Sequence, residues 1–135
     1  MQRKVLGTAA VVLALGAGGC GGEDTLTKAE LIKQANLICK EAIKKTPRRG
    51  TLTAKVLAYQ NIKISGMREL KPPAELESRM EQYTRVQMAL REVFEQYSRA
   101  PKRKGPGRAV IAEGERLQKR GKALSTALGL TACRI

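Results

Sequence analysis

Four segments of this 135-residue chain carry apolar residues at three- and four-residue steps, and this spacing is the feature that most constrains the fold. Such steps put the apolar side chains on one face of a helix, whereas a strand would need strict alternation. The segments cover residues 27–45, 53–70, 74–99 and 108–128, and stretches with proline or glycine separate them. Because short connections favour antiparallel neighbours, we predict an all-α fold, an antiparallel four-helix bundle with up-down-up-down topology.

The first of these segments has the strongest local signals for a helix. Thr27 and Glu30 have the spacing of a capping box, and Leu26 and Leu31 occupy the two positions of a hydrophobic staple. Cys39 falls on the apolar stripe of the same segment. We therefore expect Cys39 to face the core of the bundle.

The other stripes bear on how the helices pack. The stripe of segment 74–99 could line a cofactor pocket, but its regular spacing is more typical of a bundle core. Its members are Leu76, Met80, Tyr83, Gln87, Leu90, Phe94 and Tyr97. In segment 108–128 the stripe includes Gly114 and Gly121, which lower its helix propensity. They either permit close helix packing or mark a locally loose part of the helix.

The N-terminus has the pattern of a secretory signal. Arg3 and Lys4 precede the apolar segment 5–15, and small residues follow up to Cys20. The apolar segment is shorter than the ~20 residues of a membrane span. An ordinary signal peptide does not require a cysteine directly after its cleavage site. Cys20 is therefore either there by chance or has a role of its own.

The segment "GAGGC", residues 16–20, resembles the junction of bacterial lipoprotein signals, although that family usually has leucine where this chain has Ala17. In the family, the cysteine thiol receives a diacylglycerol and the cysteine becomes the first residue of the mature chain. The resemblance implies a cleaved signal peptide (1–19), a lipidated Cys20, a lipid-anchored linker (20–26) and a helical bundle domain (27–135). It also implies a location at the extracytoplasmic face of the cell membrane, where two acyl chains anchor the protein.

Cys39 and Cys133 remain once Cys20 carries a lipid. Two leftover cysteines in an oxidising, exported compartment are expected to form a disulfide. The alternative is a pair of buried free thiols that act as small apolar side chains. The two cysteines can meet if the last helix stops partway along the bundle and residues 129–133 lie against the first helix. A disulfide that closes so long a loop would contribute roughly 4–5 kcal/mol in the chain-entropy model.

The order of four motifs resembles a group of short helical lipoproteins of actinobacteria. The motifs are "GCGG" at 19–22, "LTKAELIKQANLICKEA" at 26–42, "LKPPAELE" at 70–77 and "LGLTAC" at 128–133. The resemblance implies an exported, disulfide-closed, all-helical domain and carries no activity with it. This chain is strongly basic, whereas such proteins are usually acidic, so the resemblance does not extend to a ligand.

Enzymatic chemistry finds little support in the sequence. The chain has no histidine, so a serine or cysteine nucleophile lacks its usual base and a metal site lacks a common ligand. The carboxylate pairs Glu77 with Glu81 and Glu113 with Glu115 could be considered as acid and base, but we expect them to be solvated charges. The sequence therefore predicts no enzyme, no cofactor and no metal site.

Basic residues concentrate in two stretches without acidic residues, 42–68 and 96–112, in a chain with a net charge of +14. In an up-down-up-down bundle the loops after the first and third helices lie at the same end, away from the lipid. We therefore predict one basic pole that binds anions. The candidate anion-binding residues are Lys44, Lys45, Arg48, Arg49, Arg99, Lys102, Arg103, Lys104 and Arg108.

These observations predict a non-enzymatic binding module of the cell envelope whose basic pole binds an anionic wall polymer. Nucleic acid would also be attracted to this charge, but with only 3% aromatic residues the chain offers few surfaces for base stacking. Two alternatives remain open. The basic pole could serve only to keep the domain soluble, or the protein could be a structural or interaction lipoprotein whose helical faces bind an exported protein.

Overall fold

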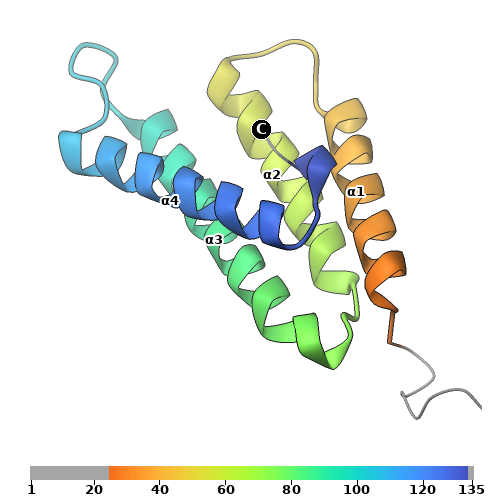
Figure 1. The fold of residues 1–135 in the computed structure, drawn as a ribbon. Helices are drawn as coiled ribbons and strands as arrows, with labels where there is room; N and C mark the ends of the chain where they lie inside the picture. The colour runs from red at the N-terminus through yellow and green to blue at the C-terminus, as the bar shows by residue number, and fades with distance from the viewer. Residues whose placement is uncertain (1–24, 134–135) are drawn as a thin grey trace, which may run out of the picture.

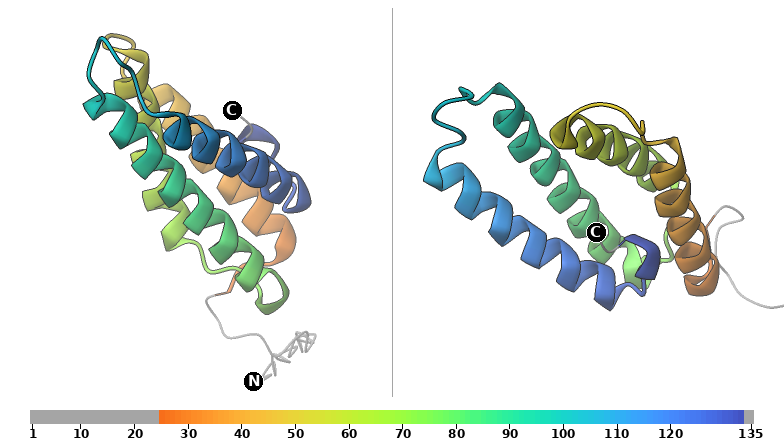
Figure 2. Two further views of the ribbon diagram at one scale, coloured as in Figure 1. Left: turned by 90° about the vertical axis from the view of Figure 1, so that its left-hand side faces the viewer. Right: turned by 90° about the horizontal axis from the view of Figure 1, so that it is seen from above.

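The computed structural model describes residues 25–133, which form four helices and a final 3-10 turn (Figure 1). The elements are α1 (Lys28–Lys45), α2 (Leu52–Glu69), α3 (Ala74–Arg99), α4 (Arg108–Ala127) and η1 (Thr131–Cys133). Each helix packs against the next one in the chain and runs back along it (Figures 1 and 2). The predicted all-α, four-helix bundle is confirmed.

Two sequence predictions fall on residues that the structure does not describe. The signal peptide 1–19 and the lipidated Cys20 lie outside the described residues, as does most of the linker 20–26. Within residues 25–133, no helix has the length and apolar content that crossing a membrane would require.

The start of α1 has the predicted capping box. The backbone N–H of Glu30 donates to Thr27 Oγ1 at 3.3 Å, and the backbone N–H of Thr27 donates to Glu30 Oε2 at 2.9 Å. These bonds satisfy donors that have no partner within the helix. The hydrogen bond from the Thr27 backbone also lowers the pKa of the Glu30 carboxyl. Leu26 and Leu31 belong to the same apolar cluster, as the staple requires.

The core consists of two apolar clusters. The first joins all four helices and η1 near the end of the molecule where α1 begins. Its buried members are Leu31, Ala35, Cys39, Met67, Leu76, Met80, Tyr83, Leu128, Leu130 and Cys133. The second joins only α3 and α4, through Val86, Leu90, Val93 and Leu117. The far half of α4 is thus held by α3 alone.

The two glycines on the α4 stripe permit a close approach between α3 and α4. A Cβ atom added at Gly121 would lie 3.1 Å from Gln87 Nε2, and one added at Gly114 would lie 3.3 Å from Val93 Cγ1. Both distances are at the tight end of normal contacts. Of the two predicted roles for these glycines, close helix packing is therefore the one observed.

The end of α4 turns the chain back toward α1. Gly129 has a φ of 73°, in the left-handed region that favours glycine. The N–H of Leu130 donates to Ser125 O at 2.8 Å, and the N–H of Gly129 donates to Thr126 O at 3.1 Å, the two bonds of a Schellman motif. This motif ends the helix partway along the bundle, as the sequence predicted.

The segment after α4 lies against α1 and is covalently joined to it. Cys39 and Cys133 form a disulfide across 94 sequence positions, with their Cα atoms 5.3 Å apart. Asn36 on α1 reinforces this contact, because its Oδ1 accepts from the Ala132 N–H at 2.8 Å and its Nδ2 donates to Gly129 O at 3.4 Å. The predicted disulfide is confirmed.

The bundle is open between α1 and α4. These helices do not pack along their lengths, and η1 fills the corner between them at one end (Figures 1 and 2). The close packing at Gly114 and Gly121 draws α4 onto α3, while the disulfide holds only the chain after α4 against α1. This arrangement leaves a cavity, which is described below.

Candidate functional site

The nine predicted anion-binding residues all have exposed side chains. They occupy the end of α1, the loop after it, the end of α3, the loop after that and the first residue of α4. Both loops lie at the end of the molecule opposite to the start of α1 (Figures 1 and 2). We call this set of nine residues the basic end.

Few residues of the basic end are neutralised by neighbouring carboxylates. Lys44 Nζ lies 2.8 Å from Glu41 Oε1, and Arg99 lies 3.8 Å from Glu95 Oε2. The other seven side chains form no ion pair with any described residue. The two loops that carry most of these charges are set apart from each other in Figure 1. A ligand must therefore be extended to contact both loops at once.

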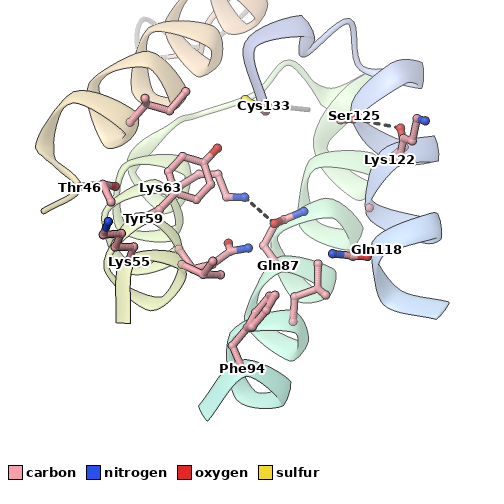
Figure 3. A pocket seen from close by; sticks show the side chains of 15 residues that line it. Thr46, Lys55, Tyr59, Lys63, Gln87, Phe94, Gln118, Lys122, Ser125 and Cys133 are labelled. Carbon is pink, nitrogen blue, oxygen red and sulfur yellow. Dashed lines mark hydrogen bonds between the residues drawn. The ribbon is translucent and has the colours of Figure 1, made fainter. Parts of the chain in front are cut away.

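A cavity of about 490 Å³ lies between the pair α1 and α2 and the pair α3 and α4 (Figure 3). All four helices and η1 contribute to its wall. Of the described residues that line it, three are lysines and none is acidic. We call it the lysine cavity, after Lys55, Lys63 and Lys122.

Lys63 is the buried cation of this cavity, with only 2% of its surface exposed. Its Nζ donates to Gln87 Oε1 at 2.6 Å and lies 4.7 Å from the centre of the Tyr59 ring (Figure 3). Both partners are neutral, and the ion pairs among the described residues do not include Lys63. Burial lowers the pKa of the Lys63 ammonium to about 7.

Two further polar atoms at the cavity are buried without a hydrogen-bond partner among the described residues. They are the hydroxyl of Tyr59 and Oε1 of Gln60. Burial also raises the pKa of Tyr59 to about 12. Unsatisfied buried polar atoms are rare in folded proteins, so each of these two atoms requires an explanation.

The glutamates weighed as an acid and base lie on the surface. Glu77, Glu81 and Glu115 are exposed and Glu113 is partly exposed. Glu81 pairs with Arg85 on its own helix, and Glu113 Oε1 lies 2.6 Å from Arg116. Hydrogen bonding to Arg116 lowers the pKa of the Glu113 carboxyl. The described residues contain no cluster of three or more histidine, cysteine, aspartate or glutamate side chains suited to a metal ion.

In comparisons with protein-family models, with curated proteins and with solved structures, nothing matches this chain.

Sequence reasoning missed the lysine cavity because it treated Lys63 only as one of the basic residues of the stretch 42–68 and assigned it no place in the core. The signal was nevertheless present in the spacing. Lys63 follows Tyr59 by four residues and precedes Met67 by four, so the three share one helix face. Tyr59 and Met67 are both buried, and Lys63 is buried between them.

Proposed function

We propose that this protein is a lipid-anchored, non-enzymatic binding module of the cell envelope, and that its basic end binds an anionic envelope polymer. The observation that carries the proposal is the gathering of nine exposed basic side chains at one end of the bundle, of which only two form ion pairs with described residues. Concentrated charge of one sign attracts polyanions and speeds their association.

The position of the basic end supports an anchored orientation. The linker that would carry a lipidated Cys20 enters α1 at the opposite end of the molecule (Figure 1). An anchor at that end would hold the domain with its basic residues directed away from the membrane. Wall polymers would then be within reach of the two basic loops.

A polymer suits this surface better than a small anion. The two loops are set apart in Figure 1, and the nine basic side chains at this end of the molecule are all exposed, whereas sites for small molecules usually enclose most of the ligand. A polyanion can contact both loops and release counterions at each, which makes its affinity fall steeply with salt. The same reasoning applies to nucleic acid, which a test must therefore include.

Binding of inorganic polyphosphate across a salt series tests the proposal, with double-stranded DNA as the comparison. One variant, Lys102→Gln/Arg103→Gln/Lys104→Gln, removes three charges from the α3–α4 loop. We expect it to weaken binding and to reduce the slope of log affinity against log salt by about one for each lost phosphate contact. A second variant, Arg48→Gln/Arg49→Gln, should act in the same way from the other loop.

The matched control removes three exposed charges nearer the opposite end, in Lys28→Gln/Lys33→Gln/Arg79→Gln. It has the same net charge as the triple loop variant and should bind polyphosphate more tightly than that variant does. Equal losses in both would show that only net charge matters and would contradict a specific basic end. Tighter binding of DNA than of polyphosphate would assign the surface to nucleic acid instead.

The alternative of an exported protein partner would need a concentrated apolar surface. The large apolar side chains that are exposed in the described residues lie on four different helices. They are Leu37, Ile43, Leu52, Met88 and Ile111. Because single exposed apolar residues are common on any protein, they do not favour this alternative over the basic end.

A further inference from the structure

The lysine cavity contains a cation for which no described residue supplies a counter-ion. An ammonium group has three N–H donors, and the structure gives Lys63 one hydrogen bond, to the neutral amide of Gln87. Burying a charge without an opposite charge is unfavourable, so such residues are rare unless they serve a purpose. Because Lys63 lines the cavity, a ligand there can supply the missing negative charge.

The wall of the cavity combines this polar position with an apolar surface. Lys63 and Gln87 meet near the Tyr59 ring, and the Phe94 side chain lies on the other side of Gln87 (Figure 3). Val56 and Leu90 add further apolar wall. The volume, about 490 Å³, is within the range of about 300–1,000 Å³ that is typical of small-molecule sites.

We infer that the lysine cavity binds an apolar carboxylic acid, with the carboxylate on Lys63 and the apolar part against Val56, Leu90 and Phe94. A second polar contact is available from the Tyr59 hydroxyl, which lines the cavity, is buried without a partner among the described residues and can donate to the carboxylate. This ligand would satisfy the charge of Lys63 and cover the apolar wall in one step.

The charge of the cavity selects among ligand classes. A cation would be repelled, since three lysines and no acidic residue line the wall among the described residues. A neutral apolar molecule would leave Lys63 without a counter-ion. A doubly charged phosphate would exceed the single buried charge, because Lys122 is exposed and Lys55 is only partly buried. One carboxylate matches one buried ammonium.

This inference is independent of the proposed function. None of the nine residues of the basic end lines the lysine cavity. Substitutions in the basic end should therefore leave binding in the cavity intact, and substitutions in the cavity should leave polyphosphate binding intact. Failure of either proposal can be recognised without the other.

Calorimetric titration with dodecanoate and with dodecanol, both below their aggregation concentrations, tests the inference. The two probes share the apolar chain and differ in charge. Wild-type protein should bind dodecanoate more tightly than dodecanol. Lys63→Met, which nearly preserves side-chain volume, should weaken dodecanoate binding by about 10- to 100-fold, as expected for loss of a hydrogen bond to a charged group. It should not weaken dodecanol binding.

Lys122→Met is the matched control, because it removes an exposed lysine from the wall of the same cavity. It should change dodecanoate affinity far less than Lys63→Met does. Naphthoate and naphthol form a second pair of probes, and comparison of the two acids distinguishes a chain from a ring as the apolar part. Circular dichroism of Lys63→Met verifies that the helices are retained.

The pH dependence provides a readout on the wild-type protein alone. Dodecanoate affinity should fall as pH rises above 7, by up to about 10-fold per unit, because Lys63 loses its proton there. The other titratable groups at the cavity are Tyr59 and Lys55 on α2 and Lys122 on α4, and Tyr83 on α3 interacts electrostatically with Tyr59. Burial raises the pKa of both tyrosines above their ordinary value of 10, so neither loses its proton in the pH range where Lys63 does. Dodecanol affinity should not fall with pH.

Three results would overturn the inference. The first is that neither acid binds, and the second is that dodecanoate and dodecanol bind the wild-type protein equally. The third is that Lys63→Met, with its helices intact, retains full affinity for the acids. Each result rules out Lys63 as the anchor of a carboxylate.

Discussion

Lys63 Nζ on α2 lies 2.6 Å from Gln87 Oε1 on α3, and both side chains are buried. This hydrogen bond connects the two central helices at the edge of the lysine cavity (Figure 3). It joins a cation to a neutral amide, so the bond does not neutralise the charge. The buried charge of Lys63 therefore lowers the stability of the folded protein, and it does so only at pH values where Lys63 is protonated.

Lys63→Met should raise the free energy of unfolding at pH 6–7, and this gain should shrink as pH rises. Burial lowers the pKa of Lys63 from 10.5 to about 7 in the folded protein. Between these two values the unfolded chain holds the proton more tightly, so wild-type stability rises with pH by up to about 1.4 kcal/mol per unit. Below pH 7 both states are protonated and the penalty is complete. Urea denaturation of both proteins from pH 6 to 10 measures the difference.

Other groups that titrate between pH 6 and 10 contribute equally to the two proteins and cancel in this difference. Lys122→Met, which removes an exposed lysine from the same wall, is the control for loss of one positive charge. A gain in Lys63→Met that stays constant from pH 6 to 10 would show that Lys63 keeps its proton throughout this range.

Removal of the disulfide should lower stability substantially. In Cys39→Ser/Cys133→Ser we expect a loss of about 2–5 kcal/mol, because the bond closes a long loop and joins η1 to α1. Denaturation of wild type and the double variant, each with and without a reducing agent, measures the loss. Reduction should bring wild type close to the variant and leave the variant unchanged.

Cys20→Ser in the unlipidated chain controls for loss of a cysteine outside the disulfide. It should denature like wild type under oxidising conditions. If the double variant were as stable as wild type, the noncovalent contacts of η1 would be sufficient to hold the end of the chain.

The helices could be predicted from the sequence because neighbouring residues determine where each helix begins and ends. The disulfide could be predicted from the number of cysteines. Thr27 and Glu30 fix the start of α1, Pro72 and Pro73 separate α2 from α3, and Gly129 ends α4. The disulfide followed from the number of cysteines that would be left if Cys20 carried a lipid, as its resemblance to a lipoprotein signal implies. The prediction that the chain after α4 would reach α1 followed from the expected lengths of the helices. Each helical residue adds a fixed rise along the axis, so the number of residues indicates where along the bundle each helix ends.

The lysine cavity was not predictable because it results from how elements fit together in space. Helical spacing shows which residues share a face, but it does not show how deeply that face is buried. The depth at Lys63 depends on α3, which supplies Gln87, and on α4, which is drawn onto α3 at Gly121. The basic residues of the loops were easier to predict, since loops lie on the surface in any fold.

Asn36 should be important for holding the end of the chain against α1. Asn36→Ala removes the acceptor of the Ala132 N–H and the donor to Gly129 O, so we expect a loss of about 1–3 kcal/mol. The disulfide should also become easier to reduce, because the segment after α4 loses two hydrogen bonds to α1. Asn61→Ala, on the exposed surface of α2, is the control. Equal reduction rates in wild type and Asn36→Ala would mean that these hydrogen bonds do not limit access to the disulfide.

At Gly66, α2 approaches α1 closely. A Cβ atom added there would lie 2.8 Å from Ile38 Cγ2 and 3.2 Å from Ile38 Cγ1, both near the branch point of the side chain. These atoms cannot move away without a change of rotamer or a shift of the helix. Gly66→Ala should therefore lower the free energy of unfolding by about 1–3 kcal/mol, as overpacking usually does.

If α1 and α2 were farther apart at this position, Gly66→Ala should instead raise the free energy of unfolding. In an exposed helix, replacing glycine with alanine stabilises by about 1 kcal/mol, because alanine has the higher helix propensity. The double variant Gly66→Ala/Ile38→Ala separates the two effects. Removing the Ile38 side chain costs stability by itself, but the added cost of Gly66→Ala should vanish in that background, which a double-mutant cycle measures as coupling. Additive losses would contradict direct contact between these two positions.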